Sequence, residues 1–522
     1  MNNSLKKWKF SDWLYVISVG IAFCFLAVIL FLCFFESVWC DEVFSLYIIQ
    51  GSYLDILINT AVDVHPPLYY FILKFFTDVI GGVFPFINVV MLTKVISFSS
   101  ITILFYFSVF KLTKVINKNI VSLFLLIFFG VSAISDFSIT VRMYGFALLF
   151  VFVALYYLIR IIKFNQDKDW KRFVLFFELS ALTHYFALIA AGAMFVYLLF
   201  YVLLNKKQDF WKWYKYLFYA ILAFVPWLVV FICQFAYISS FGFWITKPDS
   251  SGIFSIINYG FAPKVLGAKG TFENVLMLVV FAIYFALFVS NCLNKKLDKN
   301  EKWIAFSGMF VSLFLYAFGL AVSILITPVF VERYANPIFG ALCLSFGYNI
   351  YLFMKHYIVD KLKNKNILKS NGRCVAATFA TLLIAITSIY SLFNIINNVK
   401  HEQINNDNFV KNAQFFDEHK EDILISDYGR VQSVFEYSHN VNIDGIEGED
   451  VSWWENVTLL KHKAYNYESI KTQLESNKTV ILLHTTIDLE EFGKYNINCH
   501  KIDELYIESG DVVDIYELKL GA

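Results

Sequence analysis

The sequence predicts a mainly α-helical protein, a polytopic transmembrane bundle of about 11 spans with a small α/β domain at its C-terminal end. Three observations predict this fold. Hydrophobic residues make up 58% of the 522 residues, and the mean hydropathy is +0.59. Apolar runs long enough to cross a bilayer alternate with short lysine-rich segments. From about residue 397 the composition changes to that of a soluble protein.

The first span is predicted at residues 13–35, where an apolar run follows Lys6, Lys7 and Lys9. No small-residue cleavage site ends this run, so we expect an uncleaved span whose N-terminus lies in the cytoplasm. Further spans are predicted at residues 89–110, 120–135, 143–162, 214–234, 275–292, 303–326, 337–354 and 374–396.

The run at residues 173–204 is too long for one ordinary span and short for two. Lysine and arginine clusters flank both of its ends, and the positive-inside rule places both flanks in the cytoplasm. We therefore expect two tight crossings, with Thr183-His184-Tyr185 turning near the outer face.

The same rule places the first polar loop, residues 36–88, and the C-terminal tail outside the cytoplasm. Residues 68–80 are apolar but short, and Lys74 and Asp78 interrupt them, so we expect a helix that lies in the outer interface or re-enters. If this segment crosses, every later assignment inverts. The predicted domains are a transmembrane domain, 1–396, and a soluble extracytoplasmic α/β domain, 397–522.

The predicted elements of the tail are strands at 422–426, 479–484 and 512–518 and a helix at 469–476. The tail glycines show no phosphate-loop spacing, so we expect no nucleotide site there. A net charge of +1 with dispersed lysines makes nucleic-acid binding an unfavoured function. Cys40 and Cys499 are the pair of cysteines in polar loops, and two free thiols are favoured over a disulfide.

Five short motifs follow one another along the chain, two of them in the first outer loop. They are Asp41-Glu42, Asp63-Val64-His65-Pro66-Pro67-Leu68-Tyr69-Tyr70, Arg142-Met143-Tyr144, Thr183-His184-Tyr185-Phe186, and Glu332-Arg333-Tyr334 with Pro337. This order resembles the GT-C superfamily of integral-membrane glycosyltransferases, and looks most like its bacterial branch related to protein O-mannosyltransferases and lipid A aminoarabinose transferases. The resemblance covers roughly residues 10–350; the tail matches only as a soluble piece outside the membrane.

The resemblance implies a sugar donor on a polyprenyl phosphate and a catalytic base from the first outer loop. The expected activity is that of an inverting glycosyltransferase at the extracytoplasmic face of a bacterial plasma membrane. The partners are the lipid-linked donor, membrane lipids and a cell-envelope glycan, lipid or protein as acceptor. No cofactor is expected. A metal held by Asp41, Glu42, Asp63 and His65 is the unfavoured alternative, since no Asp-x-Asp pattern appears in the loop.

The carboxylates suit this chemistry, because the phosphate is already a good leaving group and the step mainly needs a base and cations. Asp41 is the predicted base and Glu42 orients or backs it; apolar neighbours such as Trp39 and Phe44 could raise a carboxylate pKa. The alternative is two solvated acids or a helix cap. Asp63 is predicted to take part in catalysis, with a helix cap as an alternative that does not exclude this.

The predicted substrate-binding residues combine cations, one acid and aromatic rings. They are His65, Tyr69, Arg142, Tyr144, His184, Glu332 and Arg333. The chain has six arginines against 37 lysines, and Arg142 and Arg333 lie at the outer ends of spans, where a guanidinium suits phosphate. Local pairs, Arg142 with Asp136 and Arg333 with Glu332, remain alternatives. His184 is equally a turn histidine. Tyr70, Trp244 and Tyr334 could stack on sugar or line a prenyl groove, or only form an interface belt.

Two other functions remain open at this point. A transporter or flippase of lipid-linked sugars would also need spans and outer cations, but it would not need paired acids in the first loop. An inactive scaffold that recruits a partner through residues 397–522 is the third reading.

Overall fold

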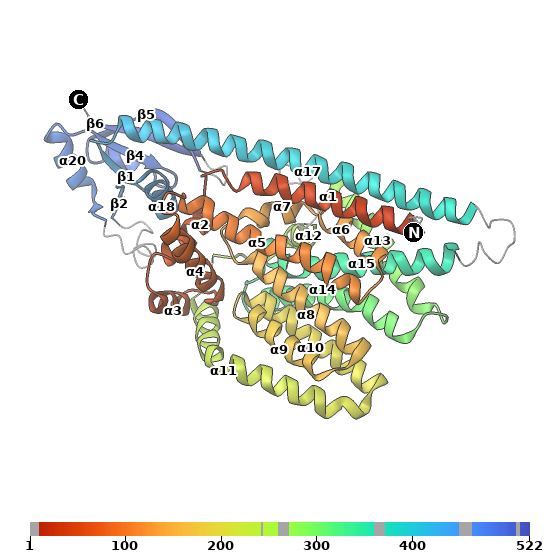
Figure 1. The fold of residues 1–522 in the computed structure, drawn as a ribbon. Coiled ribbons are helices and arrows are strands. Elements are labelled where there is room, and N and C mark those ends of the chain that lie inside the picture. The colour runs from red at the N-terminus through yellow and green to blue at the C-terminus, as the bar shows by residue number, and fades with distance from the viewer. Residues whose placement is uncertain are drawn as a thin grey trace. The chain divides into compact units, whose positions relative to one another are not determined.

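The computed structural model describes residues 10–241, 244–258, 271–359, 371–447, 462–507 and 512–521, most of them helical (Figure 1). Within these residues, seven helical segments are long and apolar enough to cross a membrane, or eight if one bent pair counts as a span. The seven are Asp12–Leu32, Val89–Lys114, Tyr144–Phe164, Tyr185–Asn205, Lys207–Ser240, Lys299–Leu325 and Glu332–His356. The chain is an integral membrane protein, as predicted.

Every segment predicted as a span is helical. The helices concerned are α1 (Phe10–Leu32), α5 (Val89–Phe110), α6 (Lys118–Phe128) with α7 (Ser132–Ile139), α8 (Tyr144–Phe164), α9 (Asp167–Ala181), α10 (Tyr185–Asn205), α11 (Phe210–Phe241), α13 (Thr271–Leu293), α14 (Lys299–Leu325), α15 (Phe339–Phe353) and α17 (Asn371–Glu418). α6 and the helix after it bend by 82°. The count of 11 spans is not confirmed, but the mainly helical architecture is.

The predicted pair of crossings at residues 173–204 folds as two helices, α9 and α10, joined by residues 182–184. The turn therefore lies at the predicted place in the chain, whereas a crossing by α9 and the side on which the turn lies stay predictions. His184 is the N-cap of α10, and its Nδ1 accepts the backbone N–H of Phe186 at 3.1 Å. A histidine at this position supplies one of the acceptors that a helix start needs.

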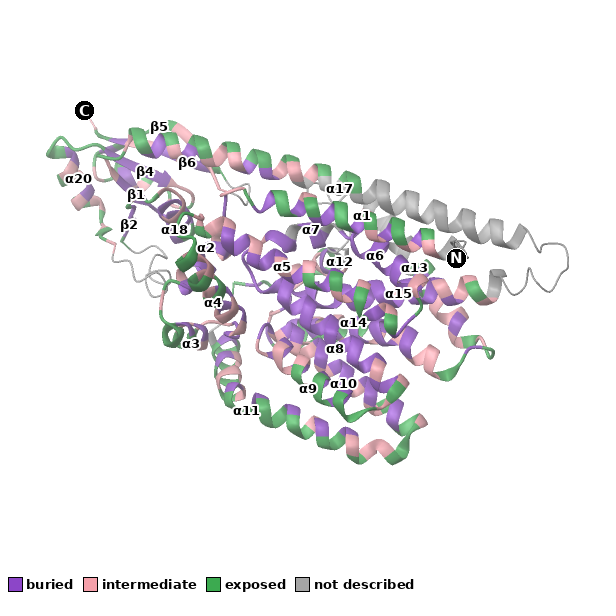
Figure 2. Ribbon diagram, viewed as in Figure 1, coloured by how far each residue is buried: buried purple, intermediate pink, exposed green. Residues whose placement is uncertain are grey.

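Among the seven spans named above for the described residues, α8 is the most deeply buried (Figure 2). It packs against α9, α10 and α15.

Close packing between spans relies on small residues. A Cβ on Gly308 of α14 would lie 2.0 Å from the carbonyl oxygen of Ala341 in α15, so the two backbones nearly touch there.

α4 (Leu68–Val83) has 16 residues, and a helix of this length is about 24 Å long, shorter than the hydrocarbon core. Lys74 and Asp78 form an ion pair one turn apart at 3.3 Å. Three short helices accompany it in the polar segments: α2 (Cys40–Ile48), α3 (Tyr53–Val62) and α12 (Ser250–Asn258).

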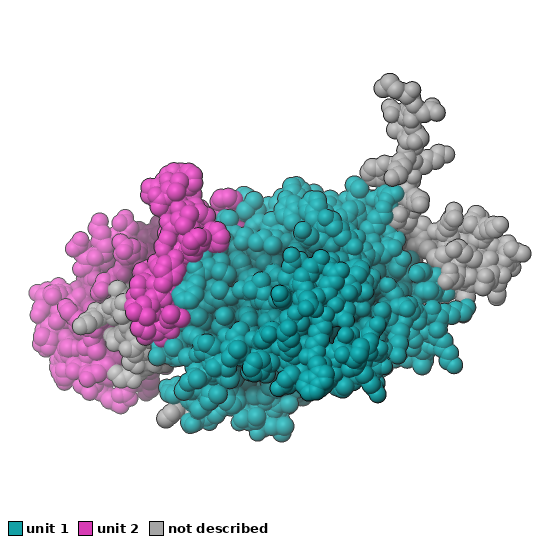
Figure 3. Space-filling view, turned by 60° about the horizontal axis from the view of Figure 1, so that its bottom comes forward, with its two compact units in different colours: residues 1–31, 60–72, 95–398 teal, residues 32–59, 73–94, 399–522 magenta. Residues whose placement is uncertain are grey.

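The chain divides into two compact units, coloured separately in Figure 3. Unit 1 holds residues 1–31, 60–72 and 95–398, and unit 2 holds residues 32–59, 73–94 and 399–522. Parts of the first polar loop thus cluster with the C-terminal residues: the rings of Tyr47 in α2 and Tyr437 in α18 (Gly429–His439) meet at 5.2 Å. The boundary at 398/399 is close to the predicted 396/397; the assignment of domains stays a prediction.

A six-stranded sheet forms the core of unit 2, in the order β3-β2-β1-β4-β6-β5. The strands are β1 (Ile423–Ser426), β2 (Asp444–Ile446), β3 (Ala464–Tyr465), β4 (Val480–His484), β5 (Ile497–Tyr506) and β6 (Val512–Leu520). The first four are parallel and the last two antiparallel to their neighbours. The predicted strands β1, β4 and β6 and the helix α20 (Tyr467–Glu475) are confirmed, whereas α18, β2, β3 and β5 were not predicted.

Alternate residues of the central strands enter two hydrophobic clusters on opposite faces of the sheet: Leu424 in one, Ile425 in the other. Such strands read as continuous apolar runs, which is why β1 and β4 were visible in the sequence. Cys40 lies at the start of α2 and Cys499 in β5.

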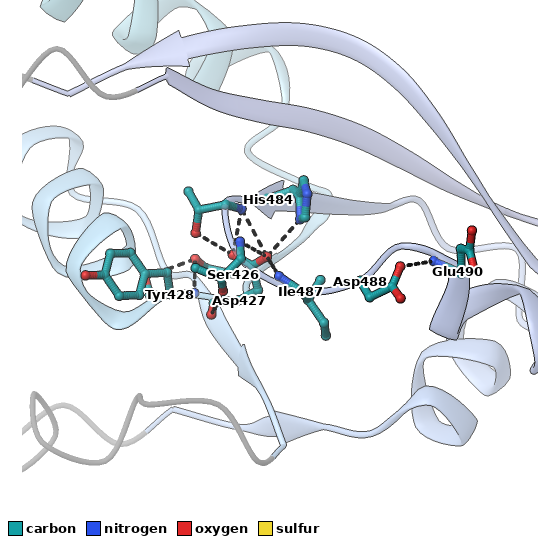
Figure 4. Close-up of polar contacts among 9 residues, drawn as sticks. Ser426, Asp427, Tyr428, His484, Ile487, Asp488 and Glu490 are labelled. Atoms are coloured by element: carbon teal, nitrogen blue, oxygen red, sulfur yellow. Dashed lines mark hydrogen bonds and ion pairs between the residues drawn. The ribbon is translucent and has the colours of Figure 1, made fainter.

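The carboxyl ends of β1 and β4 are joined through Asp427, whose side chain is fully buried (Figure 4). Its carboxylate accepts the His484 Nδ1–H at 2.8 Å and the backbone N–H groups of Thr485, Thr486 and Ile487. Burial alone would raise the pKa of Asp427, but these hydrogen bonds outweigh it and lower the pKa to about 2.

Candidate functional site

The segment between α3 and α4 carries Asp63 and His65, and their side chains meet. Asp63 Oδ2 lies 2.8 Å from His65 Nδ1, and each side chain is only 10% exposed. Pro66 and Pro67 follow directly, and the Pro67 carbonyl accepts the N–H of Phe71 in the first turn of α4. The two prolines limit the backbone conformations of this approach. The acidic residue and the histidine thus form one pre-arranged pair.

Arg142 reaches the other side of the His65 ring. Its Nη2 lies 3.5 Å from His65 Nε2, and its Nη1 donates to the Tyr70 hydroxyl at 3.3 Å. These contacts fit a neutral imidazole whose Nδ1–H donates to Asp63, because Nε2 is then an acceptor for the guanidinium. Arg142 is only 4% exposed. Four residues from two separate motifs therefore form a continuous polar chain, Asp63, His65, Arg142 and Tyr70.

The turn between α9 and α10 closes over this chain. The Leu182 carbonyl accepts the backbone N–H of Leu68 at 3.0 Å, which ties the turn to the start of α4. The His184 ring lies 6.0 Å from the His65 ring and 5.8 Å from the Tyr144 ring. His184 is thus a turn histidine that caps α10, and its ring also lies beside the Asp63–His65 pair; its part in substrate binding stays a prediction.

Burial lowers the pKa of His184 well below its usual value, and the positive charges of Arg142 and Arg333 lower it further. The ring is neutral at physiological pH. Its neutral Nδ1 is also what the cap of α10 requires, because only an unprotonated nitrogen accepts the Phe186 N–H.

The segment η4 (Glu332–Ile338) contributes the last of the predicted residues. Glu332 Oε1 accepts the Ser255 hydroxyl of α12 at 2.5 Å. The Arg333 guanidinium lies 5.1 Å from the centre of the Trp244 ring, a cation–π distance. Tyr334 packs edge-on against His184 at 5.1 Å. Of this motif, Tyr334 is the residue with a ring contact to His184.

Tyr69 and Tyr144 occupy different places. The Tyr69 hydroxyl bonds to Ser97 of α5 at 2.9 Å and its ring is fully buried, so this side chain joins α4 to α5. Tyr144 opens α8 and packs between Phe137 and His184. In the described contacts it is the neighbouring Tyr70, not Tyr69, that meets Arg142.

A cavity of about 270 Å³ adjoins this cluster within unit 1. His65, His184, Tyr185, Gln234 and Tyr334 contribute its polar groups, and aliphatic and phenylalanine side chains from α10, α11 and α14 form nearly all of the remaining wall. A largely apolar cavity with a few polar groups on its wall is the form of a ligand site that takes a hydrocarbon chain with a polar head.

Asp41 and Glu42 belong to unit 2, at the start of α2. Glu42 is 2% exposed, and its carboxylate accepts the backbone N–H of Trp39 at 3.2 Å, so it caps the helix. Asp41 is half-buried in the same turn. Lys94 of α5 holds the preceding backbone, since its ammonium donates to the carbonyls of Phe35 and Ser37 at 3.1 and 2.7 Å. The convergence of Asp41 with Arg142 stays a prediction.

Two further expectations concern the alternative partner of Arg142 and a metal site. The Asp136 side chain, the alternative partner of Arg142, is not among the described side chains. Searched over the described parts of the chain, no group of three His, Cys, Asp or Glu side chains is placed to hold a metal ion.

Sequence reasoning grouped Tyr70 and Tyr334 with other aromatic residues and had no reason to prefer them as site residues. It assigned no role to Gln234 or Lys94. A polar residue inside an apolar span was the available signal for Gln234 and Lys94, because such residues are expensive unless paired.

Comparisons with known proteins agree with the fold and the motifs. Residues 64–230 match the family model of dolichyl-phosphate-mannose-protein mannosyltransferases. The crystal structure of apo ArnT from Cupriavidus metallidurans is 11% identical, with a TM-score of 0.56 over 96% of this chain and 98% of that chain. The structure of the same protein bound to undecaprenyl phosphate is 11% identical, with a TM-score of 0.58 over 98% of both chains. No curated protein matches at the sequence level. The predicted resemblance to GT-C membrane glycosyltransferases is thereby confirmed.

Proposed function

We propose that this membrane protein, with the fold of ArnT and a mannosyltransferase-like segment at 64–230, transfers a sugar from a polyprenyl phosphate to a cell-envelope acceptor. One observation carries the proposal: the polar chain from Asp63 through His65 to Arg142 lies beside a largely apolar cavity. A lipid phosphate needs both surroundings, a cation for its head and an apolar wall for its chain.

The donor is the part of the substrate pair that the site supports best. Arg142 is the proposed phosphate ligand, because a guanidinium presents two parallel N–H donors to an oxyanion. Tyr70 and His65 hold that guanidinium in place. Arg333 and Glu332 supply further charge, and the rings of Tyr144, His184 and Tyr334 form a surface against which a prenyl unit or a sugar can pack. Tyr69 supports this surface indirectly, because its hydrogen bond to Ser97 joins α4 to α5.

The reaction is proposed as a single displacement with inversion. The acceptor hydroxyl oxygen attacks the anomeric carbon, the bond from that carbon to the phosphate oxygen breaks, and its electron pair leaves with the phosphate. The hydroxyl proton passes to the carboxylate of Asp41. Glu42 fixes the first turn of α2, which carries Asp41, and Asp63 orients the His65 ring through its contact with Nδ1. The developing phosphate charge is stabilised by Arg142.

The proposed location is the plasma membrane of a bacterium, with the active site on the extracytoplasmic face and the N-terminus in the cytoplasm. The support is the distribution of lysines between the loops, which favours this orientation by the positive-inside rule. The transferred group is a hexose or pentose. Lipids and the envelope acceptor complete the set of partners, and neither a metal nor another cofactor is required by the displacement.

The test is release of undecaprenyl phosphate from undecaprenyl-phosphate-linked hexoses and pentoses by the purified protein in liposomes with cell-envelope extract as acceptor. We expect turnover by the wild type and a loss of about 100-fold or more in kcat for Asp41→Asn, the usual worth of a general base. Asp78→Asn is the matched control, since this aspartate is half-exposed and pairs only one turn away in α4. Wild-type turnover in Asp41→Asn would remove Asp41 from the base role; carrier movement without transfer would favour a transporter.

A further inference from the structure

Gln234, in the C-terminal third of the apolar helix α11, is 7% exposed and is hydrogen-bonded through both ends of its amide. Its Nε2 donates to the backbone carbonyls of Thr60 at 2.8 Å and Ala61 at 3.2 Å. Its Oε1 accepts the hydroxyl of Tyr185. That hydroxyl in turn accepts the indole N–H of Trp227 at 3.0 Å. All of these contacts lie within unit 1.

The two carbonyls belong to the last turn of α3, whose C-terminal carbonyls have no partner inside the helix. Thr60 is fully buried, so its carbonyl needs a donor from the protein. Gln234 supplies it. Asp63 follows three residues after Thr60, and the amide therefore fixes the backbone directly in front of the Asp63–His65 pair.

A second anchor holds the far side of the same segment. The backbone N–H of Leu68 donates to the Leu182 carbonyl at 3.0 Å. Residues 60–68 are thus attached to α11 at one end and to the turn before α10 at the other. Between these anchors lie Val64 and His65, which line the cavity together with Gln234 and Tyr185. The residue that holds the segment also borders the space proposed for the lipid chain.

We propose that Gln234 is a positioning residue, which sets the place of Asp63 and His65 against Arg142 by holding the end of α3. This inference rests on the proposed function for its kinetic consequence. Gln234 takes no part in proton transfer or phosphate binding. Its effect on catalysis passes through the geometry of the segment, where a displacement of about 1 Å can cost up to about 100-fold in rate.

The experiment compares Gln234→Met, which keeps the length without hydrogen bonds, with Gln234→Glu, which keeps the acceptor for Tyr185 but has no N–H for the carbonyls. Trp227→Phe is the matched control, because it removes the Trp227 N–H donor from the same network and keeps an aromatic ring at this position, while the hydrogen bonds to the Thr60 and Ala61 carbonyls stay in place. We expect kcat to fall at least about 10-fold in both Gln234 variants, with the donor KM changed less than about twofold. Trp227→Phe should stay close to wild type.

Backbone hydrogen–deuterium exchange provides a readout that does not need catalysis. In Gln234→Met, amides of residues 60–68 should exchange at least about 10-fold faster, whereas those of α10 should be unchanged. A double-mutant cycle with Asp63→Asn should show less than additive kinetic losses, because both changes act through the same segment.

Two results would overturn the inference: unchanged exchange at residues 60–68, or a loss that is fully additive with Asp63→Asn. Absence of transfer by the wild type would instead overturn the proposed function. In that case the exchange rates alone decide whether Gln234 holds the segment.

Discussion

Arg142 Nη2 and His65 Nε2 lie 3.5 Å apart although 77 residues separate them in the chain. The contact joins the start of α8 to the segment before α4, and it passes the orientation set by Asp63 on to the guanidinium. A guanidinium presents a planar pair of N–H donors that suits the oxygens of a phosphate. This relationship is the basis of the first prediction.

Replacing Arg142 should raise the KM for the donor by a larger factor than it lowers kcat. For Arg142→Ala we expect the donor KM to rise about 10- to 100-fold, and Arg142→Lys should recover only part of it because an ammonium lacks the planar pair of donors. The measurement is initial rates against the concentration of undecaprenyl-phosphate-linked sugar. Arg172→Ala, on the exposed face of α9, is the control. An unchanged donor KM in Arg142→Ala would mean that Arg142 only stabilises the fold.

Lys94 should be important for the backbone that leads to Asp41. Its side chain is buried at 1% exposure and its ammonium donates to two carbonyls just beyond α1. Lys94→Met leaves those carbonyls without a charged donor, which costs about 1–3 kcal/mol. We expect a lower thermal unfolding temperature in detergent. Lys111→Met, exposed after the end of the same helix, should unfold as the wild type does. Equal unfolding temperatures for both variants would contradict this role.

Asp427 should make unit 2 sensitive to acid. Its pKa is lowered from 3.8 to about 2 in the folded chain, so the stabilisation, about 2 kcal/mol, is complete above pH 4 and is lost as the pH falls through 2. Asp427→Asn should lower the unfolding temperature at pH 7, and the difference from wild type should shrink below pH 4. Asp488→Asn is the control, since Asp488 only accepts the nearby Glu490 N–H. If the difference in unfolding temperature between wild type and Asp427→Asn grew towards low pH, the carboxylate of Asp427 would not be the stabilising form.

The acidic motifs show which features of the site can be predicted from neighbouring residues alone. Asp41-Glu42 and Asp63-Val64-His65 were recognisable because polar residues stand out in a loop between apolar runs. The role of each residue was left open, with a helix cap among the alternatives for Asp41-Glu42. Glu42 caps α2 through the Trp39 N–H, and the Tyr69 hydroxyl bonds to Ser97 while Tyr70 meets Arg142. Two adjacent tyrosines look alike in a sequence, and helix rotation alone decides which of them faces the guanidinium.

The role of Gln234, by contrast, could not be predicted from neighbouring residues. It stands in a run that reads simply as a membrane span, and 174 residues separate it from Thr60, whose carbonyl it binds. Nothing local indicates that partner, because hydrogen bonds between distant segments depend on how the helices pack.

By itself the sequence determined the mainly helical membrane-protein fold, the pair of helices at residues 173–204, the central strands of the sheet and the motifs. Each of these depends on properties that neighbouring residues share, namely hydropathy, periodicity and the charge of short loops. Only the tertiary structure decided that Asp63, His65, Arg142 and Tyr70 form one chain beside an apolar cavity, and that Gln234 holds its backbone. Those contacts arise from the packing of helices far apart in sequence, where a rotation of one residue turns a side chain by about 100°.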